Sequence, residues 1–114
     1  SSDSLEIRLD FDEMREAGAI LGSGGIIVAD DRTCAVDLTR ILVAFCQFES
    51  CGKCFPCRLG STRGKEMVQQ AVSGEKLMNP ALLNDLLSAM KQGSLCALGG
   101  GLPLPILNAL EFLE

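Results

Sequence analysis

The sequence predicts a mostly α-helical fold, in which a small four-helix bundle over residues 33–114 follows a short β-containing segment. That segment, residues 1–32, is interpreted as a linker or as the end of a preceding domain. Three observations support this prediction. Apolar residues recur at helical spacing in the second region, where Pro, Asn and Gly also stand at the positions typical of helix ends. The first region contains polar–apolar alternation and a β-branched run, which favour strands. At 114 residues, the chain has room for one domain and little more.

Within residues 1–32, two short strands are expected. Residues 4–9 alternate polar and apolar side chains, and residues 26–28 are Ile, Ile and Val. Residues 11–19 are interpreted as one helical turn or a loop. The Gly-Ser-Gly-Gly run at 22–25 predicts a turn. It is not interpreted as a phosphate loop, because it lacks the full dinucleotide-binding fingerprint.

The first helix of the bundle is expected from Cys34 to about Phe48, with Thr33 as its N-cap. A second helix is expected over residues 57–72, ended by the Ser-Gly pair at 73–74. The predicted apolar face of the first helix is Leu38, Ile41, Leu42, Phe45 and Phe48, and that of the second is Leu59, Met67, Val68, Ala71 and Val72.

The third helix should begin at Asn79, an N-cap followed by Pro80, and should end at Gly93 as a C-terminal cap. Three glycines at 99–101 predict an open loop, and Pro103 or Pro105 then starts a fourth helix. The predicted core positions are Leu82, Leu83, Leu86, Leu87 and Met90 in the third helix, and Ile106, Leu107, Leu110 and Leu113 in the fourth.

Composition excludes several classes of function. The chain contains no His, so a His-based triad and a His-ligated metal are both excluded. The net charge of −5 argues against a nucleic-acid partner. No apolar run approaches the roughly 20 residues needed to span a bilayer, so direct membrane insertion is not expected. The amino terminus lacks the layout of a secretion signal, which favours a cytoplasmic location.

Six cysteines in a chain without a secretion signal favour metal binding over a disulfide framework. Cys51, Cys54 and Cys57 are spaced Cys-x2-Cys-x2-Cys, and Cys96 follows far downstream. Three thiolates at this spacing can bind three corners of a [4Fe–4S] cluster, and the fourth corner needs a distant ligand. Zinc and a lone reactive thiolate are alternatives that fit the spacing less well, and disulfides would need an oxidising compartment.

Cys34 and Cys46 lie outside this pattern and are interpreted as small buried apolar residues. Basic residues gather near the cysteines, where they would stabilise an anionic cluster. Two of them, Lys53 and Arg58, flank the triplet. Arg63 and Lys65 lie further along the helix and fit a role as solvated helix charges equally well.

The string from Glu49 to Gly60, Glu-Ser-Cys-Gly-Lys-Cys-x-Pro-Cys-Arg-x-Gly, resembles the iron–sulfur domain of NADH-oxidising flavoprotein subunits. These are the flavin subunit of respiratory complex I, NAD-reducing hydrogenases and NAD-dependent formate dehydrogenases. The Cys-Ala-Leu-Gly string at 96–99 and the stretch at 18–28 are similar as well. A few residues, including the run at 57–63, look closest to formate dehydrogenase beta subunits.

The resemblance implies an electron-transfer module with one [4Fe–4S] cluster bound by Cys51, Cys54, Cys57 and Cys96. It also implies that Ala97 and Leu98 face a flavin. In the family, FMN and NAD(H) bind to an upstream domain whose Gly-rich motif is absent from this sequence. The expected partners are therefore that flavin domain and other iron–sulfur subunits, and the chain alone should not be catalytic. A metal-stapled structural or docking domain is the alternative.

Overall fold

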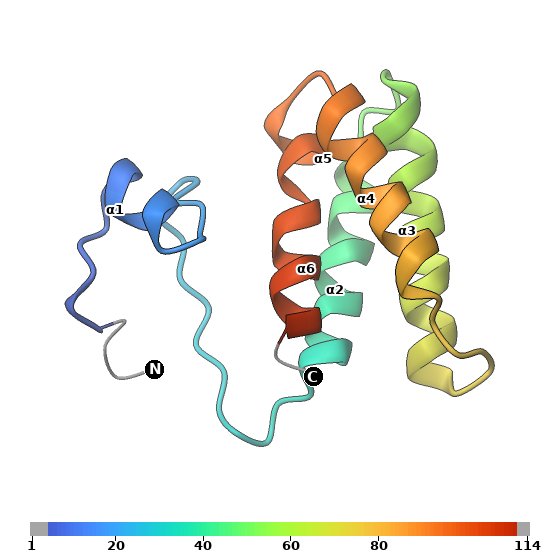
Figure 1. Cartoon of the computed structure of the whole chain (residues 1–114), viewed down its shortest axis with the longest axis horizontal. Helices are drawn as coiled ribbons and strands as arrows, with labels where there is room; N and C mark the ends of the chain where they lie inside the picture. Colours follow the sequence, from blue (N-terminus) through green and yellow to red (C-terminus); the bar gives the residue numbers. More distant parts are fainter. Residues whose placement is uncertain (1–4, 112–114) are drawn as a thin grey trace. The chain divides into compact units, whose positions relative to one another are not determined.

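The computed structural model describes residues 5–111, and the chain divides into two compact units, Ser1–Asp30 and Asp31–Glu114. The first unit contains one helix, and the second contains five helices joined by loops among the described residues (Figure 1). In chain order the helices are α1 (Phe11–Glu16), α2 (Ala35–Glu49), α3 (Phe55–Ser73), α4 (Pro80–Gly93), α5 (Ala97–Gly101) and α6 (Pro103–Glu111).

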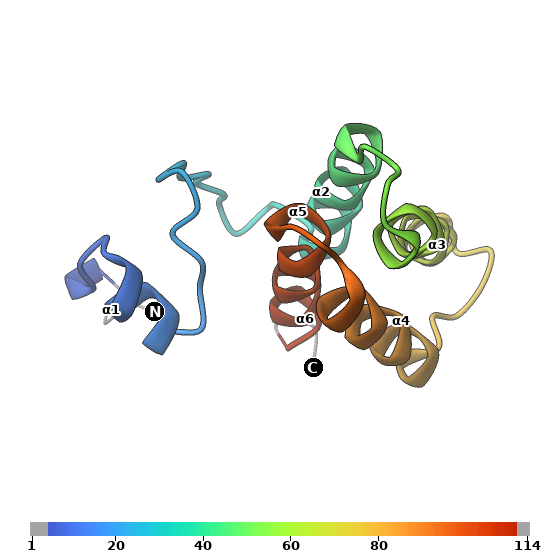
Figure 2. The ribbon, with the colours of Figure 1, turned by 90° about the horizontal axis from the view of Figure 1, so that it is seen from above.

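The second unit is a four-helix bundle, as predicted. α2 packs against α3, α3 against α4, and α6 against both α4 and α2, so the four helices surround one core. The view along the helices in Figure 2 shows this arrangement. The short α5 lies at one end of the bundle and contacts α3, α4 and α6.

The core of the bundle consists of aliphatic side chains and methionines. Its buried members are Val43, Leu83, Leu87, Met90, Leu102 and Ile106, with Cys46, Met67 and Met78 packed against them. Burial of each large aliphatic side chain contributes about 1.5–3 kcal/mol to folding. The core positions predicted for α4 are confirmed at Leu83, Leu87 and Met90, whereas the prediction was wrong at Leu82, whose side chain is exposed. In α6, Ile106 is buried as predicted and Leu107 is exposed, contrary to the prediction. The Leu110 side chain and Leu113 lie outside the described part of the chain.

Local sequence sets most helix ends as predicted. Asn79 caps α4, because its side-chain oxygen accepts a hydrogen bond from the Leu82 N–H at 3.2 Å. Pro80 takes the first helical position, where its missing N–H leaves no bond unmade. Gly74 ends α3 with φ of 72°, the left-handed conformation that favours glycine.

Two predicted helix ends and one predicted loop were wrong. Cys34 is the residue before α2, one position later than the predicted Thr33. Gly93 is the last helical residue of α4, and the chain leaves the helix at Ser94 in an extended conformation. The three glycines at 99–101 lie in α5 instead of an open loop, because the Gly100 and Leu102 N–H groups bond to carbonyls four residues back.

The face of α2 that points into the bundle also differs from the prediction. The structure buries Thr39 and Val43 and leaves Ile41, Phe45 and Phe48 exposed by 51%, 59% and 82%. α2 is apolar over more than half of its circumference, so helical spacing alone could not select the buried side. Thr39 tolerates burial because its hydroxyl donates to the Ala35 carbonyl at 2.7 Å.

α3 was predicted to bury its larger apolar residues, but most of the residues that it buries are small. The side chains of Leu59 and Val72 are exposed. Val68 is buried as predicted, and the other buried positions of α3 are Cys57, Gly60, Ser61 and Gly64. Small residues allow two helix backbones to come close together, which matters at the cysteine-bearing end of the bundle.

The first unit contains α1 and no strand among its described residues. Asp10 caps α1 by accepting from the Glu13 N–H at 2.8 Å, and Arg8 pairs with Glu13 at 2.6 Å. The strands predicted at 4–9 and 26–28 are not formed: residues 5–6 make a short 3-10 turn, and residues 25–30 have no regular structure. A strand needs a neighbour for its backbone hydrogen bonds, and the described residues provide none.

Among the helices of the described residues, none is long and apolar enough to cross a membrane.

Candidate metal centre

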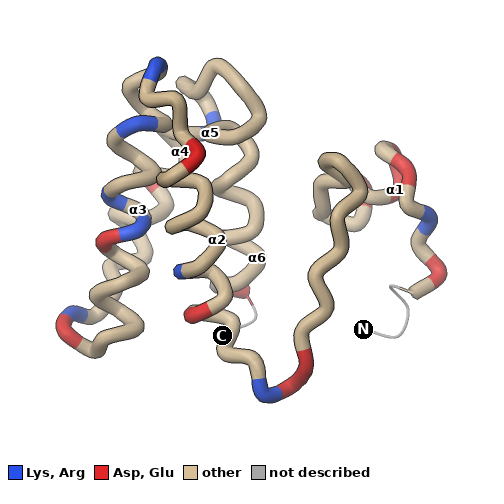
Figure 3. The backbone as a smooth tube through the Cα atoms, turned by 180° about the vertical axis from the view of Figure 1, so that it is seen from behind, with Lys and Arg blue, Asp and Glu red and all other residues tan. Residues whose placement is uncertain are grey.

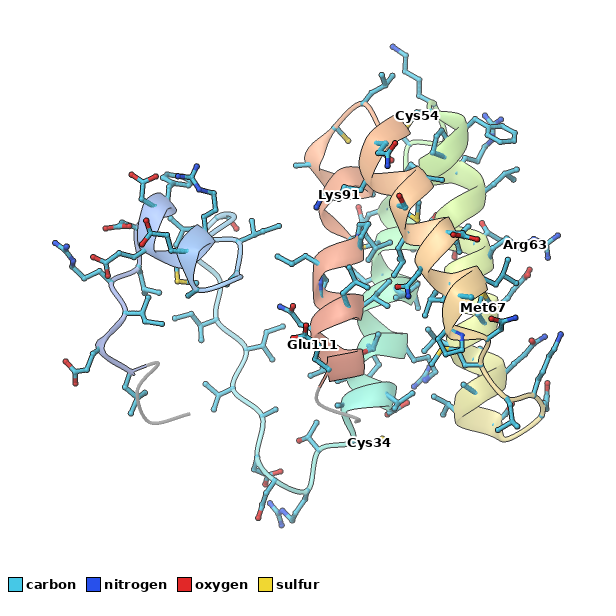
Figure 4. The ribbon with its side chains drawn as sticks, in the orientation of Figure 1. Cys34, Cys54, Arg63, Met67, Lys91 and Glu111 are labelled. Carbon is cyan, nitrogen blue, oxygen red and sulfur yellow. The ribbon has the colours of Figure 1, made fainter. Side chains whose placement is uncertain are left out.

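The predicted ligands lie at one end of the bundle. The triplet occupies the α2–α3 loop and the first turn of α3, while Cys96 precedes α5. Figure 1 places this loop, the end of α4 and α5 at the same end of the unit. In Figure 4, Cys54 is labelled at this end and Cys34 at the opposite end. The fold therefore gathers two sequence segments separated by about forty residues, which the spacing alone could not show.

Cys57 is the most deeply placed of the candidate ligands, with 5% of its surface exposed. The Ser50 hydroxyl lies 3.4 Å from its sulfur. Gly99 of α5 also lies close to it: a methyl group on Gly99 would be 2.7 Å from Cys57 Cβ and 2.9 Å from Sγ. Cys57 thus sits between the end of α2 and the start of α5.

Cys54 connects the triplet to the segment that carries Cys96. The backbone N–H of Leu95 is the main cause that lowers the pKa of the Cys54 thiol below its ordinary value. Hydrogen bonds from the backbone of Cys57 and Cys54 act in the same direction. Because the thiolate is the form that binds metal, this environment favours coordination at Cys54.

Cys51 and Cys96 are both exposed. Within residues 5–111 no three Cys, Asp or Glu side chains are already arranged as a metal site. The structure thus brings Cys54 and Cys57 together with the 94–99 segment, and it leaves the side chains of Cys51 and Cys96 at the surface of the same end.

Arg58 holds the ligand loop in place. Its guanidinium donates to the Gly52 carbonyl at 2.8 Å and lies 5.9 Å from the centre of the Phe55 ring. Gly52 has φ of 72°, a left-handed conformation that favours glycine, and its carbonyl is the group to which Arg58 donates. The sequence indicated Arg58 only as a nearby positive charge.

The other three basic residues differ in their surroundings. Lys53 is exposed in the ligand loop. Arg63 pairs with Glu66 at 2.6 Å, and Lys65 donates to the Gln47 side chain at 3.2 Å. Figure 3 shows basic positions along α3 and the loop before it. Arg63 and Lys65 therefore behave as ordinary helix charges, and Lys53 and Arg58 belong to the cysteine end.

The two remaining cysteines occupy unlike environments. Cys34 is exposed, contrary to the prediction that it is buried. Cys46 is half-buried and packs against the core, which agrees with the prediction. Burial, with a smaller effect from Cys57, raises the pKa of the Cys46 thiol and so disfavours a thiolate there.

Two serines at the site were not predicted from the sequence. Ser50 lies beside Cys57, and the Ser94 hydroxyl is buried without a hydrogen-bond partner. The signal that could have found them is their position, since Ser50 directly precedes Cys51 and Ser94 comes two residues before Cys96. An unpartnered buried hydroxyl among soft sulfur ligands fits a site that holds an iron–sulfur cluster.

Comparison with known proteins gives one family. Residues 37–114 match the family described as the NADH-ubiquinone oxidoreductase-F iron–sulfur binding region.

Two relatives illustrate the similarity. The NADP-reducing hydrogenase subunit HndC of Solidesulfovibrio fructosivorans is 33% identical over 108 residues, which are 94% of this chain and 22% of that protein. The F 2 subunit of the NADH-quinone oxidoreductase of Rhizobium meliloti (strain 1021) is 37% identical over 108 residues, 94% of this chain and 26% of that protein. The chain spans about a quarter of the length of these curated relatives. The predicted closeness to formate dehydrogenase beta subunits stays a prediction.

Proposed function

Because the chain belongs to the NADH-ubiquinone oxidoreductase-F iron–sulfur binding region family, we propose that it is the electron-transfer module of an NADH-linked oxidoreductase. In this proposal Cys51, Cys54, Cys57 and Cys96 bind one [4Fe–4S] cluster. The observation that carries it is the meeting of the two cysteine segments at one end of the bundle. There Gly99 of α5 lies against both Cys57 and Ser94, and the Leu95 backbone N–H lowers the pKa of the Cys54 thiol.

The residues of this chain would hold and shield the cluster. Cys57 supplies a buried ligand, and Cys54 supplies a thiol whose pKa is already lowered. Arg58 fixes the loop between Cys51 and Cys54 through the Gly52 carbonyl. The amino end of α3, which carries partial positive charge, also favours the anionic cluster. When bound, the cluster supplies a centre that accepts and releases one electron.

Electrons would enter and leave on the exposed side of the site. Cys51, Cys96 and Ala97 are exposed there, and Leu98 is half-buried. By resemblance to the family, Ala97 and Leu98 face FMN on an upstream domain, where NADH is oxidised. Other iron–sulfur subunits of the same oxidoreductase would take the electrons onward. The activity of the whole protein and its terminal substrate belong to those parts.

The ligand assignment is tested by cluster assembly. Anaerobically purified protein should contain about four irons and four sulfides per chain. Serine at Cys51, Cys54, Cys57 or Cys96 should reduce or abolish assembly, and Cys34→Ser and Cys46→Ser are the matched controls. Stoichiometric zinc without sulfide would contradict the cluster. Loss of iron in Cys46→Ser with normal iron in Cys96→Ser would contradict the ligand set.

The alternative function is a metal-stapled structural domain, since a cluster shared by the two segments would also tie α3 to the α4–α5 segment. A redox titration separates the two functions. A relay is reduced and reoxidised reversibly at a potential close to that of its donors, whereas a staple cycles poorly or loses iron on reduction. The chain alone should show no NADH oxidation, with or without added FMN.

A further inference from the structure

Two hydroxyl groups lie near Cys57, one at the end of α2 and one at the end of α4. Ser50, the residue after α2, lies 3.4 Å from the Cys57 sulfur. Ser94, the residue after α4, lies beside the same side chain: one methyl group placed on Gly99 would be 2.5 Å from Ser94 Oγ and 2.9 Å from Cys57 Sγ. Both serines are therefore placed next to the ligand by the ends of helices, and Ser94 also lies against Gly99 of α5.

The hydrogen bonds already made by Ser50 indicate the direction of its contact with sulfur. A hydroxyl has one proton to donate and two positions at which it can accept. The Gly52 N–H donates to Ser50 Oγ at 3.3 Å, which uses an accepting position. The proton of Ser50 is left for Cys57, whose metal-binding form is the thiolate, an acceptor.

The Ser94 hydroxyl is buried and makes no hydrogen bond in the described structure. Buried polar groups are nearly always paired, because leaving one unpaired costs free energy. A sulfur carrying negative charge beside Cys57 would supply the missing acceptor. A methyl group on Gly99 would clash with both Ser94 Oγ and Cys57 Sγ, so no residue larger than glycine fits at position 99 without a shift of its neighbours.

We propose that Ser50 and Ser94 donate hydrogen bonds to sulfur on the Cys57 side of the cluster and raise its reduction potential. This inference rests on Cys57 being a ligand, as in the proposed function. Reduction adds one electron, taken from the donor, to the cluster and makes its sulfurs more negative. Hydrogen bonds to anionic acceptors are stronger than neutral ones, so the two serines stabilise the reduced form more than the oxidised form.

The test is a redox titration of the cluster-loaded chain, with dithionite as reductant, at matched pH and salt. Ser50→Ala and Ser94→Ala should each lower the midpoint potential, and the double variant should lower it further. The added electron is shared over the cluster, so each shift should stay below about tenfold in the reduction equilibrium, or ~59 mV. Ser50→Thr keeps the hydroxyl and should restore a potential close to that of the parent.

Ser61→Ala is the matched control. The Ser61 hydroxyl is also buried without a partner, but it lies four residues after Cys57, one turn further along α3. Its removal should leave the potential unchanged. An equal shift in all three alanine variants would overturn the proposal, as would unchanged potentials in Ser50→Ala and Ser94→Ala with full iron content.

A second measurement separates tuning from a purely structural role. Pulsed electron–nuclear double resonance detects exchangeable protons close to the cluster sulfurs when spectra of the reduced protein in H2O and in D2O are compared. The parent should show two strongly coupled exchangeable protons. One of them should be missing in Ser50→Ala, and the other in Ser94→Ala. If Ser94→Ala assembles no cluster, Ser50→Ala decides by the same two readouts. Failure of the parent to bind iron and sulfide would instead refute the proposed function itself.

Discussion

The middle of the bundle and its cysteine end are built by different means. In the middle, large aliphatic side chains from three helices fill the core, with Val43, Leu83 and Ile106 almost completely buried. At the cysteine end, contacts form where a side chain is missing. Gly60 faces Met90, Gly93 faces Pro56, and Gly99 faces Cys57.

This difference teaches what each region can tolerate. A hydrophobic core accepts other residues of similar volume, because burial depends mainly on apolar area. At Gly60, Gly93 and Gly99 almost no other residue is accepted, since the first added carbon would already collide with a neighbouring side chain. The middle should therefore determine how stable the bundle is, and the cysteine end should determine whether the ligands meet.

The largest effect is expected from Leu83→Ala in the middle. This side chain has no exposed surface, so its truncation removes apolar burial and leaves a cavity. The free energy of unfolding should fall by about 2–5 kcal/mol, measured by urea denaturation at matched iron content. Leu82→Ala, at the exposed neighbouring position, is the control and should change it by less than about 1 kcal/mol. Equal losses in both variants would contradict the assigned core.

At the cysteine end, Gly99→Ala should act on the ligands themselves. The added methyl group would lie 2.5 Å from Ser94 Oγ and 2.7 Å from Cys57 Cβ. Overpacking of this kind costs about 1–3 kcal/mol, and here it would push Cys57 away from the 94–99 segment. We expect a lower iron content per chain after anaerobic reconstitution.

Gly100→Ala is the matched control for that variant. It lies in the same short helix, and its nearest neighbour, the Lys91 carbonyl oxygen, would be 4.0 Å from the new methyl group. Its iron content should equal that of the parent. If the two alanine variants assemble the cluster equally well, close packing at Gly99 is not what brings the segments together.

A third change, Asn79→Ala, tests whether the two regions are independent. Asn79 caps α4 at the end of the helix opposite to Ser94, and losing the cap should cost about 1 kcal/mol of unfolding free energy. Because the cysteine end is not touched, iron content and midpoint potential should not change. Asn84→Ala, at an exposed position within α4, is the control. A lower midpoint potential in Asn79→Ala would show that the two regions are coupled.

The same contrast explains how much the sequence could predict. The helices of the bundle and the caps at Asn79 and Gly74 follow from local rules, so they were predicted. Three of the candidate ligands follow from local spacing in the triplet, and Cys96 was predicted from the need for a distant fourth ligand and from the family resemblance. The buried face of α2 does not, because this helix is apolar on two sides and only its neighbours select one.

The rest depends on contacts between distant segments. The roles of Ser50, Ser94 and Gly99 appear only when the α2–α3 loop meets the segment before α5. The three glycines at 99–101 predicted an open loop, yet they form α5, since that helix is stabilised by its packing rather than by propensity. The strands expected at 4–9 and 26–28 failed for the converse reason: their residues suit strands, but no partner strand is present among the described residues.

The smallest expected effect is a gain. Gly60 and Gly64 lie one turn apart on the buried side of α3, but their surroundings differ. A methyl group on Gly64 would lie 3.9 Å from Leu86 and Val43, an ordinary contact distance. On Gly60 it would lie 2.4 Å and 2.6 Å from two side-chain atoms of Met90, which is itself buried.

Gly64→Ala should therefore stabilise the bundle by up to about 1 kcal/mol, because alanine loses less backbone entropy than glycine when a helix forms. Gly60→Ala has the same entropic advantage, but Met90 must move within the packed core, so we expect a net loss of about 1 kcal/mol or more. Urea denaturation of both variants at matched iron content gives the comparison. If both glycines behave alike, with gains at each, then α3 has room to shift, and close packing does not define the cysteine end.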